Sequence, residues 1–133
     1  MVALEHTKPT TAIELGYATV SLRKDGIINT DIKIKDAVTL SQAKELLEAY
    51  LKVGDHKKLP HLFTVSKFVI MEKEVMEFIS NTANKYGKAD AFVIHSLPQR
   101  IIGNFYLQFH KPSVPTKLFT SQAKAVIWLK TFI

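Results

Sequence analysis

Two stretches near the start of the chain alternate between apolar and polar positions. Every second residue from Ala18 to Leu22 is apolar, and the run from Ile27 to Lys35 repeats this period with Ile28, Thr30, Ile32 and Ile34 in phase. Lys24-Asp25-Gly26 separates the two runs. Strands have a two-residue period, and Asp-Gly is a dipeptide that tight hairpin turns favour. The pattern therefore predicts an antiparallel β-hairpin.

Helical spacing follows the hairpin. Apolar residues recur every three or four positions from Leu40 to Leu51, and Thr39 with Gln42 forms a capping-box pattern at the start of this run. The same spacing predicts further helices, over residues 72–86, over residues 98–110 and in a last helix capped by Thr120. Short apolar runs predict the intervening strands, at residues 61–66, 89–96 and 116–119.

The predicted elements follow the order β-β-α-β-α-β-α-β-α. Strands that alternate with helices join a parallel sheet through right-handed crossovers, so this order predicts an α/β fold. We expect an N-terminal β-hairpin followed by alternating β-α units, with a mixed, mostly parallel sheet and about four helices. A single domain is expected over residues 13–133. A flexible leader is expected at residues 1–12, which show no periodicity.

The composition is typical of a cytoplasmic protein that folds without crosslinks. The chain has 133 residues, of which 47% are hydrophobic, and it has no cysteine. The lack of cysteine excludes disulfides, a thiolate nucleophile and Cys-ligated metal sites. The start, Met1-Val2-Ala3-Leu4-Glu5-His6, lacks the basic segment and apolar run of a signal peptide. We also expect no transmembrane segment, because no uncharged apolar stretch is long enough.

The formal net charge of +6 changes this picture little. A basic chain can bind nucleic acid or an acidic membrane. The 18 basic residues are scattered, however, and the densest groups are only Lys33 with Lys35, His56-Lys57-Lys58, and Lys67 with Lys73. The chain also lacks an RNA-binding aromatic motif, an Arg-rich helix and zinc-finger spacing. We interpret the charge as solvated surface rather than as a nucleic-acid-binding face.

The sequence contains none of the common catalytic or cofactor motifs. It has no G-x-S-x-G nucleophile elbow, no Walker A motif and no G-x-G-x-x-G motif. The five histidines lack helical i, i+4 pairing, and we interpret each as a surface or core-edge residue: His6, His56, His61, His95 and His110. We therefore expect a protein that is not an enzyme and has no metal site and no cofactor.

Polar side chains follow the predicted parallel strands at their carboxyl ends, where open α/β sheets bind ligands. The residues at this rim are Ser66, Lys67, His95, Ser96, Arg100 and Thr120. Residues 95–100 bring an imidazole, a hydroxyl and a guanidinium to a helix start, which could hold an anion. The alternative, which we favour, is that Ser96 only caps the helix and Arg100 is solvated.

The third predicted helix has more apolar residues than one buried stripe needs. These residues are Ile101, Ile102, Phe105, Tyr106, Leu107 and Phe109. Under one hypothesis, part of this surface is exposed for a partner, a second copy or a lipid. The alternative, which we favour, is that both sides are packed inside the domain. We expect Gly103 to allow close packing of this helix.

The element order resembles the STAS fold of anti-sigma-factor antagonists and sulfate-transporter tails. In that family a strand and a loop lead into a helix whose first turn reads D-S-S-G or D-S-T-G, and a partner kinase phosphorylates the serine. The matching run here is residues 63–74. Glu72 replaces the aspartate, Lys73 and Glu74 replace the hydroxyl residues, and no glycine follows. The resemblance implies a regulatory fold that lacks its usual phosphoacceptor.

The chain is still more similar to a group of uncharacterised bacterial STAS-like proteins, which are often labelled together with CRAL-TRIO lipid-transfer domains. This resemblance covers about residues 13–133 and rests on residues 17–27, 100–105 and 115–120. It implies fold rather than activity. We expect a non-catalytic regulatory or scaffolding module that binds a protein partner or itself. The alternative is a carrier or sensor of a small apolar or anionic ligand. The candidate binding residues are Ser66, Lys67, Glu72, Lys73, Glu74, His95, Ser96 and Arg100.

Overall fold

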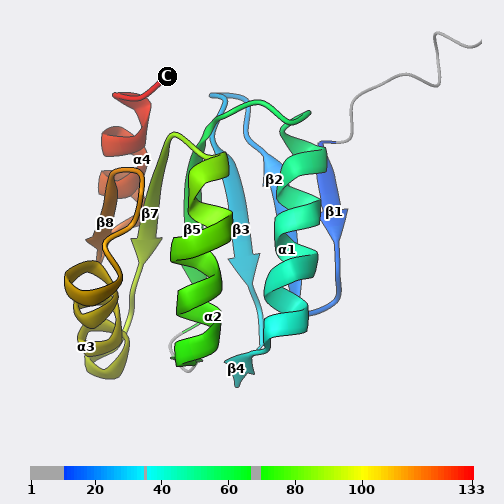
Figure 1. Ribbon diagram of the computed structural model, residues 1–133. Coiled ribbons are helices and arrows are strands. Elements are labelled where there is room, and N and C mark those ends of the chain that lie inside the picture. Colours follow the sequence, from blue (N-terminus) through cyan, green and yellow to red (C-terminus); the bar gives the residue numbers. More distant parts are fainter. Residues whose placement is uncertain (1–10, 35, 67–69) are drawn as a thin grey trace, which may run out of the picture.

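Figure 1 shows the computed structural model of the chain, which describes residues 11–34, 36–66 and 70–133. Within these ranges, six strands form one sheet in the order β1-β2-β3-β5-β7-β8. Their bounds are Ala12–Glu14, Ala18–Leu22, Ile28–Ile32, Pro60–Val65, Ala89–Val93 and Thr116–Phe119. The pairs β1–β2 and β2–β3 are antiparallel, and the remaining pairs are parallel. The predicted mixed, mostly parallel sheet is confirmed.

Helices cover both faces of this sheet, which confirms the α/β class. The described residues form four α-helices: α1 (Leu40–Val53), α2 (Lys73–Phe78), α3 (Leu97–Phe105) and α4 (Gln122–Lys130). α1, α2 and α3 lie on one face, and α4 lies on the other (Figure 1). A small parallel pair, β4 (Ala37–Val38) with β6 (Ile70–Met71), precedes α1 and α2. Among these helices, none has both the length and the apolar character to cross a membrane.

The β2–β3 hairpin forms where the alternating pattern predicts it. Gly26 has a φ of +87°, a backbone conformation that glycine adopts without strain. The Asp25 carboxylate accepts a hydrogen bond from the backbone N–H of Ile27 and forms an ion pair with Arg23 at 3.0 Å. The turn is therefore fixed by local chemistry that is readable in the sequence.

Strand alternation divides the hydrophobic core into two layers. On one face, Ile28 and Ile32 of β3 pack in the cluster that contains the buried residues of α1 and α2. On the other face, Leu62 of β5 and Ala91 of β7 pack with Leu129 of α4. Successive side chains of a strand point to opposite faces, so one strand contributes to both layers.

The second and third helices end in turns that are not α-helical. After α2, the chain continues through a π turn (Ile79–Ala83) and a 3₁₀ turn (Asn84–Tyr86). After α3, it continues through a π turn (Tyr106–His110). The predicted helical extents are thus confirmed, but the last turns have a different winding. π turns are rare and occur frequently at functional sites.

Some local features differ from the sequence prediction. Ser121, not Thr120, caps α4, and its hydroxyl accepts a hydrogen bond from the backbone N–H of Lys124. Ala12, at the end of the predicted leader, pairs with Ser21 in the β1–β2 ladder, whereas residues 1–10 lie outside the described residues. The sequence gives no sign of β4 and β6, because strands of two residues are too short to show a period.

Thr39→Ala is expected to lower the free energy of unfolding by about 1 kcal/mol. The Thr39 hydroxyl accepts a hydrogen bond from the backbone N–H of Gln42 at 3.1 Å, and the Gln42 side chain accepts one from the backbone N–H of Thr39 at 3.0 Å. Urea denaturation measures the change, with Ser41→Ala in the same exposed turn as the control. Equal effects of the two substitutions would show that the capping box adds nothing.

Candidate functional site

The carboxyl ends of β7 and β8 lead directly into α3 and α4, and a surface hollow lies between these helix starts. One part of it is lined by Ile94, His95, Ser96, Leu97, Arg100 and Thr120. The adjoining part shares Ile94, Arg100 and Thr120 and adds Asn104, Leu118, Phe119 and Lys124. We call the two parts together the Arg100 hollow. Its polar lining includes two cationic side chains, two hydroxyls, an imidazole and an amide, and no carboxylate among the described residues, which suits an anionic group.

The structure brings part of the predicted rim together in this hollow. His95, Ser96 and Arg100 line it with Thr120. Ser96 also caps α3, because its hydroxyl accepts a hydrogen bond from the backbone N–H of Gln99. Arg100 is exposed and forms no ion pair with any described residue. The expectations that Ser96 caps α3 and that Arg100 is solvated are therefore confirmed. Both residues also line the hollow.

Ser66 is held against the first turn of α3 but does not line the hollow. Its hydroxyl donates a hydrogen bond to the carbonyl of Ile34 at 3.0 Å. Its own carbonyl accepts one from Gln99 Nε2 at 2.6 Å, and Gln99 Oε1 accepts one from the backbone N–H of His95 at 2.8 Å. Gln99, which the sequence analysis did not select, therefore joins the ends of β5 and β7. Lys67 lies outside the described residues.

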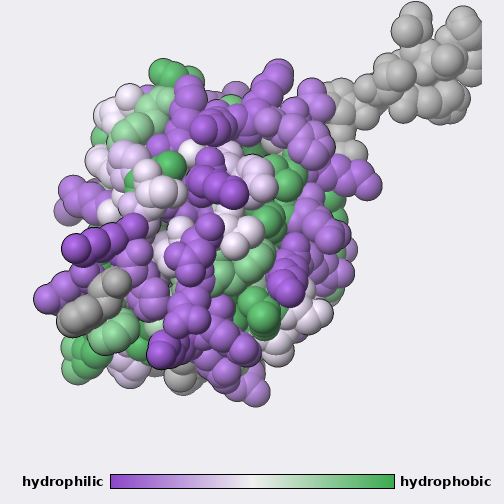
Figure 2. Space-filling view, viewed as in Figure 1, coloured by the Kyte–Doolittle hydropathy of each residue, from purple (hydrophilic) through white to green (hydrophobic). Residues whose placement is uncertain are grey.

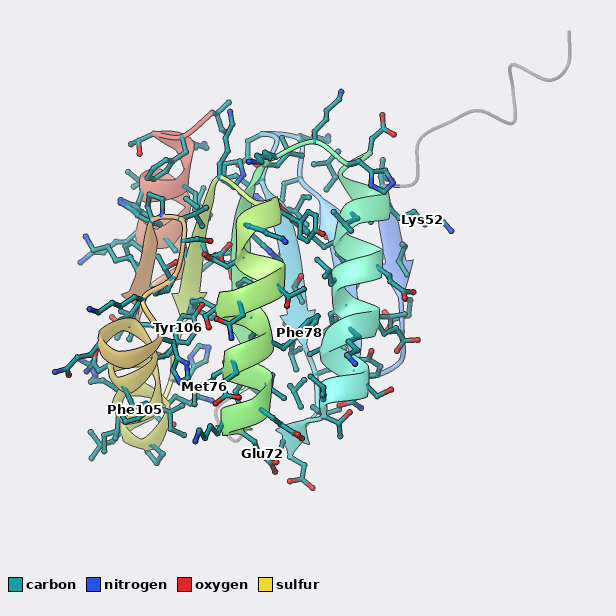
Figure 3. All side chains as sticks on the ribbon, viewed as in Figure 1. Lys52, Glu72, Met76, Phe78, Phe105 and Tyr106 are labelled. Atoms are coloured by element: carbon teal, nitrogen blue, oxygen red, sulfur yellow. The ribbon has the colours of Figure 1, made fainter. Side chains whose placement is uncertain are left out.

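Glu72, Lys73 and Glu74 lie apart from the hollow, at the exposed start of α2, where Figure 3 labels Glu72. Glu72 occupies the position before the first residue of the helix. Lys73 Nζ is 3.9 Å from Glu77 Oε1 within the same helix. The two groups of candidate residues therefore do not form one site in the described part of the chain.

The outer side of α3, beside the hollow, carries an exposed apolar stripe. Leu97, Ile101 and Phe105 have exposed fractions of 68%, 60% and 47% and follow one another at four-residue spacing. Figure 2 shows hydrophobic surface over this helix. We call these residues the α3 stripe.

The inner side of α3 packs against the sheet. A Cβ on Gly103 would lie 2.8 Å from Leu118 Cδ1 of β8, so the helix approaches this strand too closely for a larger residue without movement of Leu118. This confirms the expected packing role of Gly103. The favoured expectation that both sides of the third helix are packed is therefore wrong, because Ile101 and Phe105 are exposed, whereas Tyr106 on the inner side is buried.

The last third of the chain, which contains α3, carries most of the net positive charge. Residues 91–133, which include α3, β8 and α4, contain five basic and no acidic residues, a net charge of +5 out of +6 for the whole chain. The five are Arg100, Lys111, Lys117, Lys124 and Lys130. Of these five, Arg100 and Lys124 line the hollow beside the α3 stripe, whereas Lys130 Nζ lies 4.0 Å from Asp25 Oδ2 in the hairpin turn.

A second polar cluster lies buried under the helices, and the sequence analysis missed it. Asp90 is 3% exposed, and burial raises the pKa of its carboxyl to about 7. Asn84 Nδ2 donates a hydrogen bond to Asp90 Oδ2 at 2.6 Å. Asn84 Oδ1 accepts hydrogen bonds from the Ser113 hydroxyl and the Val114 backbone N–H. Asn84 thus connects the end of the second helix, β7 and the loop before β8.

His61 is the cross-strand neighbour of Asp90 in the β5–β7 ladder. Its Nε2 lies 2.6 Å from the Thr30 hydroxyl, and its ring stacks between Tyr50 and Phe63, with centroids 4.5 and 3.8 Å away. Burial lowers the pKa of the imidazole to about 3, so the ring is neutral at pH 7. The prediction of a surface or core-edge His61 is therefore wrong. Its phase with Phe63 in an apolar strand was the signal that pointed inward.

No group of three His, Asp or Glu side chains in the described residues is arranged to hold a metal ion.

Comparison with known proteins identifies a family. No curated protein matches the chain, and no solved structure matches it. The family described as "Domain of unknown function (DUF7793)" matches residues 20–133, which run from within β2 to beyond α4 and include the Arg100 hollow, the α3 stripe and the buried cluster. The chain therefore belongs to the DUF7793 family.

Proposed function

We propose that the protein is a non-catalytic regulatory module that binds the acidic surface of a partner protein through the α3 stripe. The observation that carries this proposal is the position of the stripe beside the Arg100 hollow, in a segment with five basic and no acidic residues. Apolar residues at four-residue spacing on an exposed helix are a common docking surface.

Each part of this surface has a distinct role in the proposed complex. Burial of Leu97, Ile101 and Phe105 supplies most of the binding energy, since large apolar and aromatic anchors dominate interfaces. Arg100 and Lys124 at the hollow attract carboxylates of the partner, which sets orientation and association rate. Binding is therefore expected to weaken as salt rises.

The regulatory part of the proposal rests on the STAS-like element order. Lys73 and Glu74 at the start of α2 replace the residues that carry the phosphorylation switch in STAS proteins, so we propose regulation by docking rather than by this switch. The non-catalytic part is supported by the exposed side chain of His95, the residue that otherwise best suits acid–base chemistry at the hollow.

The alternative function is that of a sensor of a small anionic ligand. The observation that favours it is the same Arg100 hollow, where Arg100, Lys124 and two helix starts converge. A free anion and a partner carboxylate present the same chemistry to these residues, and the crosslinking and phosphate-binding measurements distinguish the two.

Ile101→Asp is expected to weaken partner binding at least tenfold without loss of folding, because the side chain is 60% exposed. A photo-crosslinking amino acid at position 101 captures the partner in cells of the source organism, and mass spectrometry identifies it. The Kd of the purified pair is then measured at low and high salt. Ile127→Asp is the matched control, since Ile127 is 67% exposed on α4.

The outcomes distinguish the proposals. An acidic protein captured at position 101 but not at 127, with a salt-sensitive Kd that only Ile101→Asp weakens, supports the proposal. Capture of a second copy of the chain points to self-association instead. The absence of specific capture, combined with saturable inorganic phosphate binding that Arg100→Gln removes, favours the ligand sensor and contradicts docking.

A further inference from the structure

A cavity of about 70 Å³ lies between α2, α3 and the sheet. Its walls are formed mainly by apolar side chains, among them Met71, Met76, Ile79, Phe92 and Ile102. In Figure 3, Met76 and Tyr106 are labelled between α2 and α3, whereas Phe105, which is 47% exposed, is labelled over α3 itself. The cavity contains no residue of the α3 stripe in its wall, and it shares only Ile94 and Leu118 with the Arg100 hollow.

Tyr106, which lines this cavity, has an unsatisfied hydroxyl. Its side chain is 5% exposed, and its Oη has no hydrogen-bond partner among the described residues. Buried hydroxyls are almost always hydrogen-bonded, so an unsatisfied one needs a physical explanation. Burial raises the pKa of the phenol, and the negative charge of the Asp90 carboxyl raises it further, so the group is a neutral donor and acceptor.

The backbone around Tyr106 is also unusual. Tyr106 opens the π turn that ends at His110, and the buried His110 Nε2 likewise lacks a partner among the described residues. Two polar atoms in one wide turn are therefore left unsatisfied, and one of them belongs to Tyr106, which lines the cavity. π turns occur frequently at functional sites, and an unsatisfied buried polar atom needs an explanation such as a bound molecule.

Water is a poor occupant of this cavity. The volume is several times the roughly 10–15 Å³ that one water needs, but a stable buried water requires two to four polar partners. The other polar side chain in the wall, Gln99, already bonds the backbone of Ser66 and His95. Tyr106 Oη alone cannot satisfy a water cluster.

From these observations, we infer that the cavity under α3 binds a small, mostly apolar molecule that carries one hydrogen-bonding group, and that Tyr106 Oη bonds this group. The apolar walls supply burial, and the hydroxyl supplies orientation. The inference does not depend on the docking function proposed for the outer side of α3.

Phenol and toluene are matched probes for this site, because they have nearly the same shape and only phenol has a hydroxyl. Protein labelled with ¹³C at the methionine methyl groups is titrated with each probe, and NMR follows Met71 and Met76, which are assigned by Met→Leu substitution. We expect saturable shifts of both signals, with phenol binding roughly fivefold more tightly than toluene. Tyr106→Phe should bring the ratio of the two Kd values close to one.

The unliganded Tyr106→Phe protein provides a second readout. If the hydroxyl is unsatisfied without ligand, its removal leaves the Tm unchanged or raises it. A clear fall in Tm overturns the inference, since it means that the hydroxyl is already bonded. The absence of saturable methyl shifts overturns it as well, and so does a phenol preference that persists in Tyr106→Phe. Ile101→Asp should leave phenol binding unchanged, which keeps this test separate from that of docking.

Discussion

Asp90→Asn is expected to raise the free energy of unfolding at pH 8 by on the order of 4 kcal/mol. Burial raises the pKa of the carboxyl from 3.8 to about 7. At pH 8, folding therefore buries a carboxylate that the unfolded chain keeps in water. Asparagine has nearly the same shape and no charge, and its amide oxygen can accept the hydrogen bond that Asn84 donates to Asp90.

The sign of the pH dependence follows from the direction of this shift. Because the pKa of Asp90 is higher in the folded than in the unfolded state, its stabilising contribution is complete below about pH 4 and is lost as the pH rises through about 7. The Asp90→Asn protein should not show this loss.

Urea denaturation at pH 5, 6.5 and 8 measures the effect of Asp90→Asn on stability. Asp55→Asn, at an exposed position with a φ of 53° that asparagine tolerates, is the control. If Asp90→Asn gains no more stability at pH 8 than this control does, the carboxyl does not carry the burial penalty that the structure implies.

His61→Phe is expected to lower the free energy of unfolding at pH 7 by about 1–3 kcal/mol, because the buried Thr30 hydroxyl loses its partner. Phenylalanine keeps a ring between Tyr50 and Phe63. The double substitution Thr30→Val with His61→Phe should recover most of this loss, since replacing both polar partners by apolar groups leaves no unsatisfied atom.

The pH dependence of His61 has the opposite sign to that of Asp90. Burial lowers the pKa of the imidazole from 6.5 to about 3, so its stabilising contribution is complete above about pH 6.5 and is lost as the pH falls toward 3. Between pH 5 and 6.5 the two groups oppose each other. We therefore expect a nearly flat stability profile for the wild type, a rise with pH for Asp90→Asn and a fall with pH for His61→Phe.

Denaturation of the wild type, both single variants and the double variant at pH 5, 6 and 6.5 tests this opposition. A steep wild-type profile, or a His61→Phe profile parallel to it, would contradict a neutral buried imidazole. A double variant less stable than His61→Phe alone would show that Thr30 does not need the histidine as its partner.

Local chemistry made much of the fold predictable from the sequence alone. The period of two from Ala18 to Ile32, with Asp25-Gly26 between the strands, predicted a hairpin that needs no distant contact to be recognised. The Thr39 and Gln42 capping box predicted the start of α1 for the same reason. At the candidate site, Ser96 was recognised as a helix cap, and its neighbours His95 and Arg100 proved to line one hollow with it.

Tertiary structure decided the features that depend on which elements meet. Sequence spacing could not divide the apolar residues of α3 into a packed and an exposed side, because the nearness of Leu118 to Gly103 arises from the placement of β8. Nor could it reveal that His61 and Asp90 are buried neighbours, since their pairing comes from strand register between distant segments. The sequence by itself thus determined the element order and its local caps and turns, through interactions within a few residues. The two sides of α3, the cavity and the buried cluster arise only from long-range packing.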